Sequence, residues 1–316
     1  MRMRRATIGL IALAMVITAC GGSGAADPPV SSADGAAPTT TTPSSVAPTT
    51  APATAVTKGV AGPQVLDLVD PSRSVSSNGR TVSTSRSLPT TVWRPNRAGT
   101  FPLIVFAHGY RLGPPGYARF CSMLADAGYV VAAPSFPLAD ETRGNGLDRA
   151  DIPNEARDVS FVISALRAGP LGSTIAAGPV GVAGHSDGAD VALIVGYQQG
   201  YTDASVGAVV AVAPDAFTGQ LSTNRPPLLL IHADADATVP YSESEQVFGR
   251  VPGRRTFLTL LGADHLPPIA ESTSWTPVLD GAVVTFFDAT LKQVQTLESA
   301  QTLIRTLGRS RLQTAS

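Results

Sequence analysis

Short runs of consecutive apolar residues recur along the chain, and stretches with helical periodicity lie between them. The apolar runs cover residues 101–107, 130–133, 180–183, 206–213 and 228–231. Because both faces of such a run are apolar, each predicts a strand buried on both sides, as in a parallel sheet covered by helices. The helical stretches cover residues 117–127, 154–168, 189–199, 242–249 and 278–307. This alternation predicts an α/β fold with a mostly parallel, doubly wound sheet and helices on both faces.

Two further stretches complete the predicted sheet. Residues 65–93 are polar and contain many β-prone side chains, which predicts antiparallel strands at one edge. Residues 256–260 form a last short strand before the C-terminal helical region. No internal repeat is visible, so we interpret residues 60–316 as one catalytic domain.

The first residues resemble the signal of a bacterial lipoprotein. Arginines in the first five positions precede an uncharged, mostly apolar run over residues 6–19. This run is shorter than the ~20 residues that span a bilayer, and it is typical of the apolar core of a signal peptide. Cys20 follows directly, at the position of the lipidated cysteine in a lipobox. We expect a signal peptide over residues 1–19 and a lipid anchor on Cys20; the alternative is an ordinary secretory signal with a chance cysteine.

Residues 20–59 have a different composition from the rest of the chain. Thr, Pro, Ala, Ser and Gly dominate, and Asp27 and Asp34 are the only charged residues between positions 21 and 57. Such a segment has too little apolar surface to form a core, so we expect a disordered tether. With Cys20 lipidated, the tether would hold the catalytic domain at the extracytoplasmic face of the cell membrane.

Charge and cysteine content exclude several classes of protein. The formal net charge is -1, and no basic tract outside the signal peptide could neutralise many phosphates, so we expect no nucleic-acid partner. Apart from Cys20 there is one cysteine, Cys121, whose apolar helical surroundings predict a buried and unreactive thiol. No Cys/His cluster has the spacing of a zinc site, and we expect neither a metal nor a cofactor.

The motif with the most specific chemistry is Gly-His-Ser-Asp-Gly at residues 184–188. It follows an apolar strand and precedes a helix of small residues, which is the context of a nucleophile elbow. Such a turn projects the hydroxyl of Ser186 at the carboxyl edge of the sheet. Gly184 and Gly188 remove side chains where helix and strand meet, and the helix N-terminus directs backbone N–H groups at the same point.

A nucleophilic serine needs a histidine base, and the chain has four histidines. His265 lies in a loop after the last predicted strand, from which it can reach Ser186, so we predict it as the base. His108 and His232 each end a predicted strand, and His232 is expected to pack and hydrogen-bond near the sheet edge. His185 is adjacent to Ser186, and we expect the elbow to turn its side chain away.

Three aspartates compete for the position of the acid that orients the base. Asp234 and Asp236 follow the strand at 228–231, and Asp215 follows the one before it. We favour Asp236, because Pro240 predicts a turn that carries it back over the sheet, and we expect Asp234 to cap or pin the loop. Each of the three remains a candidate at this point.

An acyl-transfer site also needs two N–H donors for the oxyanion of the tetrahedral intermediate. The backbone of Asp187, the residue after the nucleophile, is one candidate. The other is the backbone of Tyr110, which follows His108 and Gly109 at the end of the first apolar strand. Gly109 lets this loop approach closely, although an ordinary turn at a strand end would have the same composition.

These motifs resemble the α/β-hydrolase superfamily, and within it the dienelactone-hydrolase-like group that includes cutinases and platelet-activating-factor acetylhydrolases. The resemblance covers residues 91–287 and implies a serine hydrolase, with Asp236 as the acid by its place before Pro240 in the loop. Cutinase-like enzymes carry an aromatic residue where this chain has Asp215. The departure leads us to expect a preference for short soluble esters over long chains and polyester.

The leading hypothesis is therefore a lipid-anchored hydrolase of small carboxylic esters, with Ser186, His265 and Asp236 as the catalytic triad. The same triad would also serve an amidase or a peptidase, since it does not select the leaving group. A third possibility is an inactive surface-binding lipoprotein on the same fold. Residues 135–153 are polar and follow a strand at the active edge, which fits either a substrate loop or a solvated connector. The oligomeric state is not predictable from the chain.

Overall fold

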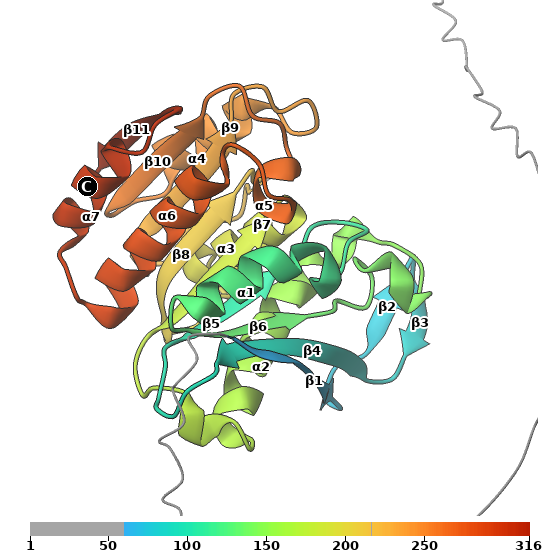
Figure 1. Ribbon diagram of the computed structural model, residues 1–316. Helices are drawn as coiled ribbons and strands as arrows, with labels where there is room; N and C mark the ends of the chain where they lie inside the picture. Colours follow the sequence, from blue (N-terminus) through green and yellow to red (C-terminus); the bar gives the residue numbers. More distant parts are fainter. Residues whose placement is uncertain (1–59, 216) are drawn as a thin grey trace, which may run out of the picture. The chain divides into compact units, whose positions relative to one another are not determined.

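The computed structural model describes residues 60–215 and 217–316, apart from the side chain of Pro267. The predicted signal peptide, Cys20 and the tether lie outside the described residues. Within them, the main sheet has nine strands in the order β1-β4-β6-β5-β7-β8-β9-β10-β11 (Figure 1). Its strands are β1 (Val60–Asp70), β4 (Arg86–Pro95), β5 (Leu103–Ala107), β6 (Val130–Pro134), β7 (Val180–His185), β8 (Val206–Val212), β9 (Leu228–Ala233), β10 (Arg255–Leu260) and β11 (Ser310–Ala315).

The six central strands, from β6 to β10, run parallel to one another. Antiparallel strands lie at both edges, β1 and β4 at one and β11 at the other. A separate hairpin consists of β2 (Val75–Ser77) and β3 (Arg80–Ser83). This architecture confirms the predicted α/β class and the antiparallel edge.

Helices cover both faces of the sheet. They are α1 (Ala118–Asp126), α2 (Ile152–Ala168), α3 (Asp187–Tyr197), α4 (Tyr241–Arg250), α5 (Pro267–Ala270), α6 (Thr276–Phe287) and α7 (Leu297–Arg305). Short 3-10 turns occupy Pro114–Tyr117, Glu141–Arg143, Arg149–Asp151 and Gly172–Thr174, and a π turn occupies Asp288–Lys292. Each of the predicted helical stretches overlaps at least one of these helices.

Strand β5 shows how one continuous apolar run contributes to two cores. Leu103 and Val105 belong to the core beneath α2 and α3, whereas Ile104 and Phe106 belong to the core beneath α1 and α6. Successive side chains of a strand point to opposite faces, so a strand between two helical layers must be apolar at every position. This requirement explains why the central strands appear in the sequence as unbroken apolar runs.

The order of the strands places a crevice between β5 and β7. The chain leaves β5 for β6 on one side, and it leaves β7 for β8 on the other. The loops after these two strands therefore diverge, and open α/β sheets bind ligands at such a point. The residues that follow β5 and β7 include Tyr110 and Ser186.

The structure differs from the sequence prediction at the C-terminus. Residues 310–315 form β11, which pairs antiparallel with β10, and this strand was not predicted. Its side chains are exposed or half-buried, so it lacks the apolar run that revealed the central strands. In the described part of the chain, no helix is both long enough and apolar enough to cross a membrane.

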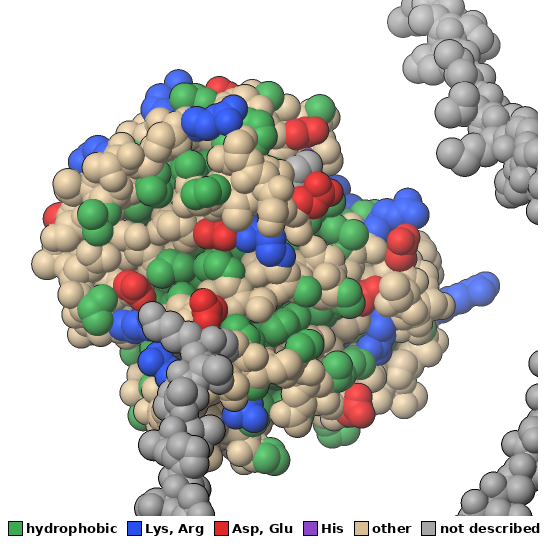
Figure 2. Space-filling model, viewed as in Figure 1, with side chains coloured by type: hydrophobic (Ala, Val, Ile, Leu, Met, Phe, Trp, Pro, Cys, Tyr) green, Lys and Arg blue, Asp and Glu red, His purple; other side chains and the backbone are tan. Residues whose placement is uncertain are grey.

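On the face shown in Figure 2, Lys and Arg side chains are dispersed among acidic and apolar ones rather than gathered into one basic patch.

Candidate active site

Ser186 lies in a strained turn between β7 and α3. Its backbone has φ 55° and ψ -127°, a region that residues with a Cβ rarely adopt. A Cβ at position 184 would collide with the backbone of Gly188, and one at position 188 would collide with the carbonyl of Ala107 at the end of β5. The elbow can therefore form only with glycine at both positions, as the motif predicted.

Asp236 is hydrogen-bonded to the imidazole of His265. The Nδ1 atom of His265 lies 2.6 Å from Oδ2 of Asp236, whose side chain is fully buried. Oδ1 of Asp236 accepts the backbone N–H groups of Thr238 and Val239, each at 2.8 Å. Burial alone would raise the pKa of Asp236, but these donors hold that pKa below its usual value. The carboxylate is thus ionised and fixed in orientation.

The two competing aspartates make other contacts. Oδ1 of Asp234 accepts the backbone N–H of Gly262 at 2.6 Å, which ties the loop after β9 to the loop that carries His265. This contact is the pinning role expected for Asp234. Oδ2 of Asp215 pairs with Nη2 of Arg149 at 2.5 Å. Of the three candidates, the structure places Asp236 against the His265 ring.

His232 is a second histidine on the same carboxylate. Its Nε2 lies 3.1 Å from Oδ2 of Asp236 and 3.2 Å from the carbonyl oxygen of Val239, which can only accept. Nε2 therefore carries the proton, and Nδ1 accepts from the hydroxyl of Ser244 at 2.7 Å. Burial lowers the pKa of His232, which favours this neutral form. The expected hydrogen bonding near the sheet edge is present, but its target, Asp236, was not predicted.

The loop after β5 is held by His108. Burial lowers the pKa of His108 to about 4, so its ring is neutral. Nε2 accepts the N–H of Phe136 at 3.0 Å, and Nδ1 donates to the carbonyl of Gly109 at 3.0 Å. In a trans peptide the C=O and the next N–H point in opposite directions. Because His108 draws the Gly109 carbonyl to itself, the N–H of Tyr110 points the other way.

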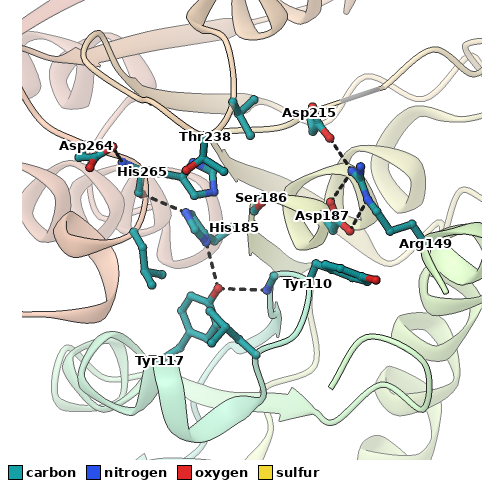
Figure 3. A pocket seen from close by; sticks show the side chains of 14 residues that line it. Tyr110, Tyr117, Arg149, His185, Ser186, Asp187, Asp215, Thr238, Asp264 and His265 are labelled. Carbon is teal, nitrogen blue, oxygen red and sulfur yellow. Dashed lines mark hydrogen bonds and ion pairs between the residues drawn. The ribbon is translucent and has the colours of Figure 1, made fainter. Parts of the chain in front are cut away.

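A hydrogen-bonded chain joins this loop to the elbow and to the loop of His265 (Figure 3). The N–H of Gly109 donates to the hydroxyl of Tyr117 at 3.1 Å, and that hydroxyl lies 3.0 Å from Nδ1 of His185. Nε2 of His185 lies 3.1 Å from the carbonyl oxygen of His265 and therefore donates to it. Burial lowers the pKa of His185 to about 3, so its Nδ1 accepts from Tyr117.

The prediction that the elbow turns His185 away from the site is wrong. His185 and Ser186 line the same pocket, and the rings of His185 and His265 lie 4.5 Å apart between centroids. The sequence around His185 does not predict its contact with His265, because this contact depends on where the loop after β10 folds back.

The pocket that contains Ser186 has a volume of about 540 Å³, within the range of small-ligand sites. It brings together Ser186, His265, Tyr110 and Asp187 from the predicted site, whereas the buried Asp236 lies behind His265. The other described lining residues are Gly109, Leu112, Tyr117, Arg149, His185, Asp215, Thr238, Val239, Asp264 and Leu266. Arg149 was not predicted individually, but it belongs to the polar segment 135–153 that we considered as a substrate loop. Across the described ranges, no group of three or more His, Cys, Asp or Glu side chains could hold a metal ion.

A family model described as chlorophyllase matches residues 66–240, which is more than half of the chain. The chain belongs to the chlorophyllase family. This is a lipase/esterase family with the α/β-hydrolase fold, so the predicted superfamily is confirmed. The part that matches the chlorophyllase family includes Ser186 and Asp236, whereas His265 lies beyond it. The match does not support the narrower dienelactone-hydrolase-like group, which stays a prediction.

Among curated proteins, the chain is similar to chlorophyllase-1, chloroplastic, from Citrus unshiu. The two are 26% identical over 182 residues, which is 56% of this chain and 51% of the relative. The chain thus spans about half the length of the curated chlorophyllase that it matches.

Proposed function

We propose that this member of the chlorophyllase family is a serine hydrolase that cleaves small carboxylic esters through an acyl-enzyme. The observation that carries the proposal is the convergence of three loops on one pocket. The loop after β7 carries Ser186, and the loop after β5 carries the peptide of Tyr110. The loop after β10 carries His265, whose ring is hydrogen-bonded to Asp236. Each loop follows the carboxyl end of a parallel strand, where the fold presents its ligand site.

The first step is acylation of Ser186, in which His265 moves the proton. Because Asp236 holds Nδ1–H of His265, Nε2 is the ring nitrogen available as the base. Ser186 Oγ attacks the ester carbonyl while Nε2 takes its proton, and the imidazolium that forms is stabilised by Asp236. Nε2 then gives this proton to the leaving alkoxide, and the acyl group remains on Ser186.

The second step is hydrolysis of the acyl-enzyme. Water attacks the acyl carbonyl, His265 accepts its proton, and Ser186 is regenerated. In both steps the oxyanion would be held by the backbone N–H groups of Tyr110 and Asp187. The strained elbow and the bond from His108 to Gly109 fix these donors before the reaction, and such preorganised donors are worth about 10²–10³ in kcat each.

We further propose that the enzyme is a lipoprotein anchored through Cys20 at the extracytoplasmic face of the cell membrane. The support is the sequence pattern of residues 1–20 and the low-complexity tether that follows. Within the superfamily, we propose that the chain is related to the dienelactone-hydrolase-like group, which its motifs resemble.

A panel of p-nitrophenyl esters from acetate to palmitate, with p-nitroanilides of the same acyl groups, tests the activity. We expect turnover of the short esters, a smaller kcat/KM for palmitate than for butyrate, and little turnover of the anilides. The control is Ser186→Ala, which should retain only the residual rate that comes from substrate binding and the oxyanion donors. Preferential cleavage of the anilides would contradict the proposal and favour an amidase.

A further inference from the structure

One wall of the pocket is a cluster of ion pairs centred on Arg149. This residue lies in the 3-10 turn that precedes α2. Its Nε and Nη2 atoms donate to Oδ2 and Oδ1 of Asp187 at 2.9 and 2.6 Å, and Nη2 also reaches Oδ2 of Asp215 at 2.5 Å. The backbone N–H of Asp215 donates to Asp190 of α3 at 3.2 Å, which fixes the position of Asp215 against the helix.

The cluster lies where the acyl part of an ester would be. In Figure 3, His265 is on one side of Ser186, whereas Arg149, Asp187 and Asp215 are on the other. The leaving alkoxide must face His265, because that residue protonates it. The acyl part therefore extends in the opposite direction, toward Arg149.

This end of the pocket carries excess negative charge. Among the described residues that line this end, Arg149 is the only cation, against the two carboxylates of Asp187 and Asp215; Asp264 also lines the pocket but lies beside His265, at the other end (Figure 3). His185 does not change this balance, since burial keeps its pKa at about 3. The Arg149 end of the pocket thus has a net charge of −1.

Arg149 cannot readily balance an incoming anion. Its hydrogen bond to Asp187, and to a smaller extent that to Asp215, raises the pKa of Arg149 above the usual value, although partial burial lowers it. Arg149 therefore stays charged and paired. The side chain of Asp187 is 5% exposed and that of Asp215 is 29% exposed. A substrate carboxylate would compete with both partners and lose its own hydration.

We propose that the Arg149–Asp187–Asp215 cluster selects esters whose acyl chain carries no negative charge, and that Asp215 is the specificity-determining residue. This inference rests on the proposed ester hydrolysis and specifies its substrate class. Asp215 is the member of the cluster that can be altered separately, because Asp187 is adjacent to the nucleophile. Without the Asp215 carboxylate, Arg149 would have one partner and could pair with an acyl carboxylate.

The test compares two esters with six-carbon acyl groups, p-nitrophenyl hexanoate and the p-nitrophenyl monoester of adipic acid. The second replaces the terminal methyl with a carboxylate. The wild type should favour hexanoate in kcat/KM by about tenfold or more, as expected for like charges that meet at a site. Asp215→Asn should reduce this preference about fivefold, whereas Arg149→Gln should increase it.

The matched control is Asp126→Asn. Asp126 is exposed at the end of α1, away from the pocket, and its replacement makes the same change in net charge. This variant should retain the wild-type preference. Equal use of both esters by the wild type, or an unchanged preference in Asp215→Asn, would overturn the inference while leaving ester hydrolysis intact.

A binding measurement separates the inference from the proposed activity. In Ser186→Ala, hexanamide and adipamic acid are compared by NMR titration, which requires no turnover. Hexanamide should bind more tightly, and Asp215→Asn in the same background should narrow the difference. Tighter binding of adipamic acid, or binding of neither amide, would overturn the inference even if no ester were hydrolysed.

Discussion

Asp236 is the residue on which the hydrogen bonds of the site converge. Its Oδ2 serves both His265 and His232, and its Oδ1 serves two backbone N–H groups. A carboxylate with this many donors is stable only as an anion, and it can hold the imidazole of His265 in one tautomer. In the proposed mechanism, Asp236 therefore orients His265 rather than transferring a proton.

Replacing Asp236 with Asn should lower kcat by about 10⁴ and leave KM nearly unchanged, because the group acts in the transition state. Steady-state kinetics on p-nitrophenyl butyrate measures both constants. Asp234→Asn is the matched control, since Asp234 bonds to the backbone of Gly262, and it should cost far less. Near-full activity of Asp236→Asn would show that another carboxylate serves His265.

His185 allows a second prediction at this scale. It accepts from Tyr117 and donates to the carbonyl of His265, so it fixes the loop that carries His265. His185→Phe should lower kcat by about 10- to 100-fold, in line with the effect of small displacements of a catalytic group, with little change in KM.

His185→Gln is the discriminating variant, because a glutamine amide retains one donor and one acceptor. It should recover most of the kcat lost in His185→Phe. If both variants behaved alike, the hydrogen bonds of His185 would not be what positions His265.

At the scale of elements, buried ion pairs hold the 3-10 turn that carries Arg149. Nη2 of Arg86 on β4 lies 2.7 Å from Oδ2 of Asp151, at the end of this turn, and 2.5 Å from Oδ2 of Asp158 on α2. The Arg86 side chain is 1% exposed, and Arg73 adds a second contact to Asp158. A buried cation thus joins the antiparallel edge of the sheet to the start of α2.

Arg86→Met should lower the free energy of unfolding by about 3–5 kcal/mol, because two buried carboxylates lose their shared partner. Urea unfolding monitored by circular dichroism measures the change. Arg80→Met on the exposed strand β3 is the control, and its effect should stay within about 0.5 kcal/mol. A loss below about 1 kcal/mol in Arg86→Met would show that the cluster is not stabilising.

The central strands that the sequence revealed as apolar runs share one property, which β11 lacks. Strands β5 to β9 are buried on both faces, so their apolar runs were visible. Strand β11 is an exposed edge held by backbone pairing with β10, which leaves no such run. The Gly-His-Ser-Asp-Gly motif was readable because backbone strain and close approach dictate residue types locally.

At the scale of the whole molecule, the site depends on contacts between residues far apart in the sequence. Ser186, Asp236 and His265 were predicted from their places after the strands now seen as β7, β9 and β10. The positions of Arg149 and His185 could not be predicted in this way, because each depends on a partner from a distant segment of the chain. Their residue types alone do not distinguish a role at the site from ordinary packing.

The proposed membrane anchor also belongs to this scale. Because Cys20 ends a lipobox-like run, the mature protein should partition into the detergent phase of Triton X-114, and Cys20→Ala should be released or remain unprocessed. Cys121→Ala is the control, since its thiol is buried and unpaired among the described residues. A mature protein found in the aqueous phase with an unmodified Cys20 would contradict the anchor.

The central claim is that Ser186 is the nucleophile of a serine hydrolase. Its most direct test is peptide mass spectrometry of the purified protein after reaction with a fluorophosphonate. We predict a single phosphonyl adduct on the peptide that contains Ser186, with no adduct in Ser186→Ala and slow labelling in His265→Ala. A folded protein that stayed unlabelled, or that carried its adduct on another residue, would contradict the claim.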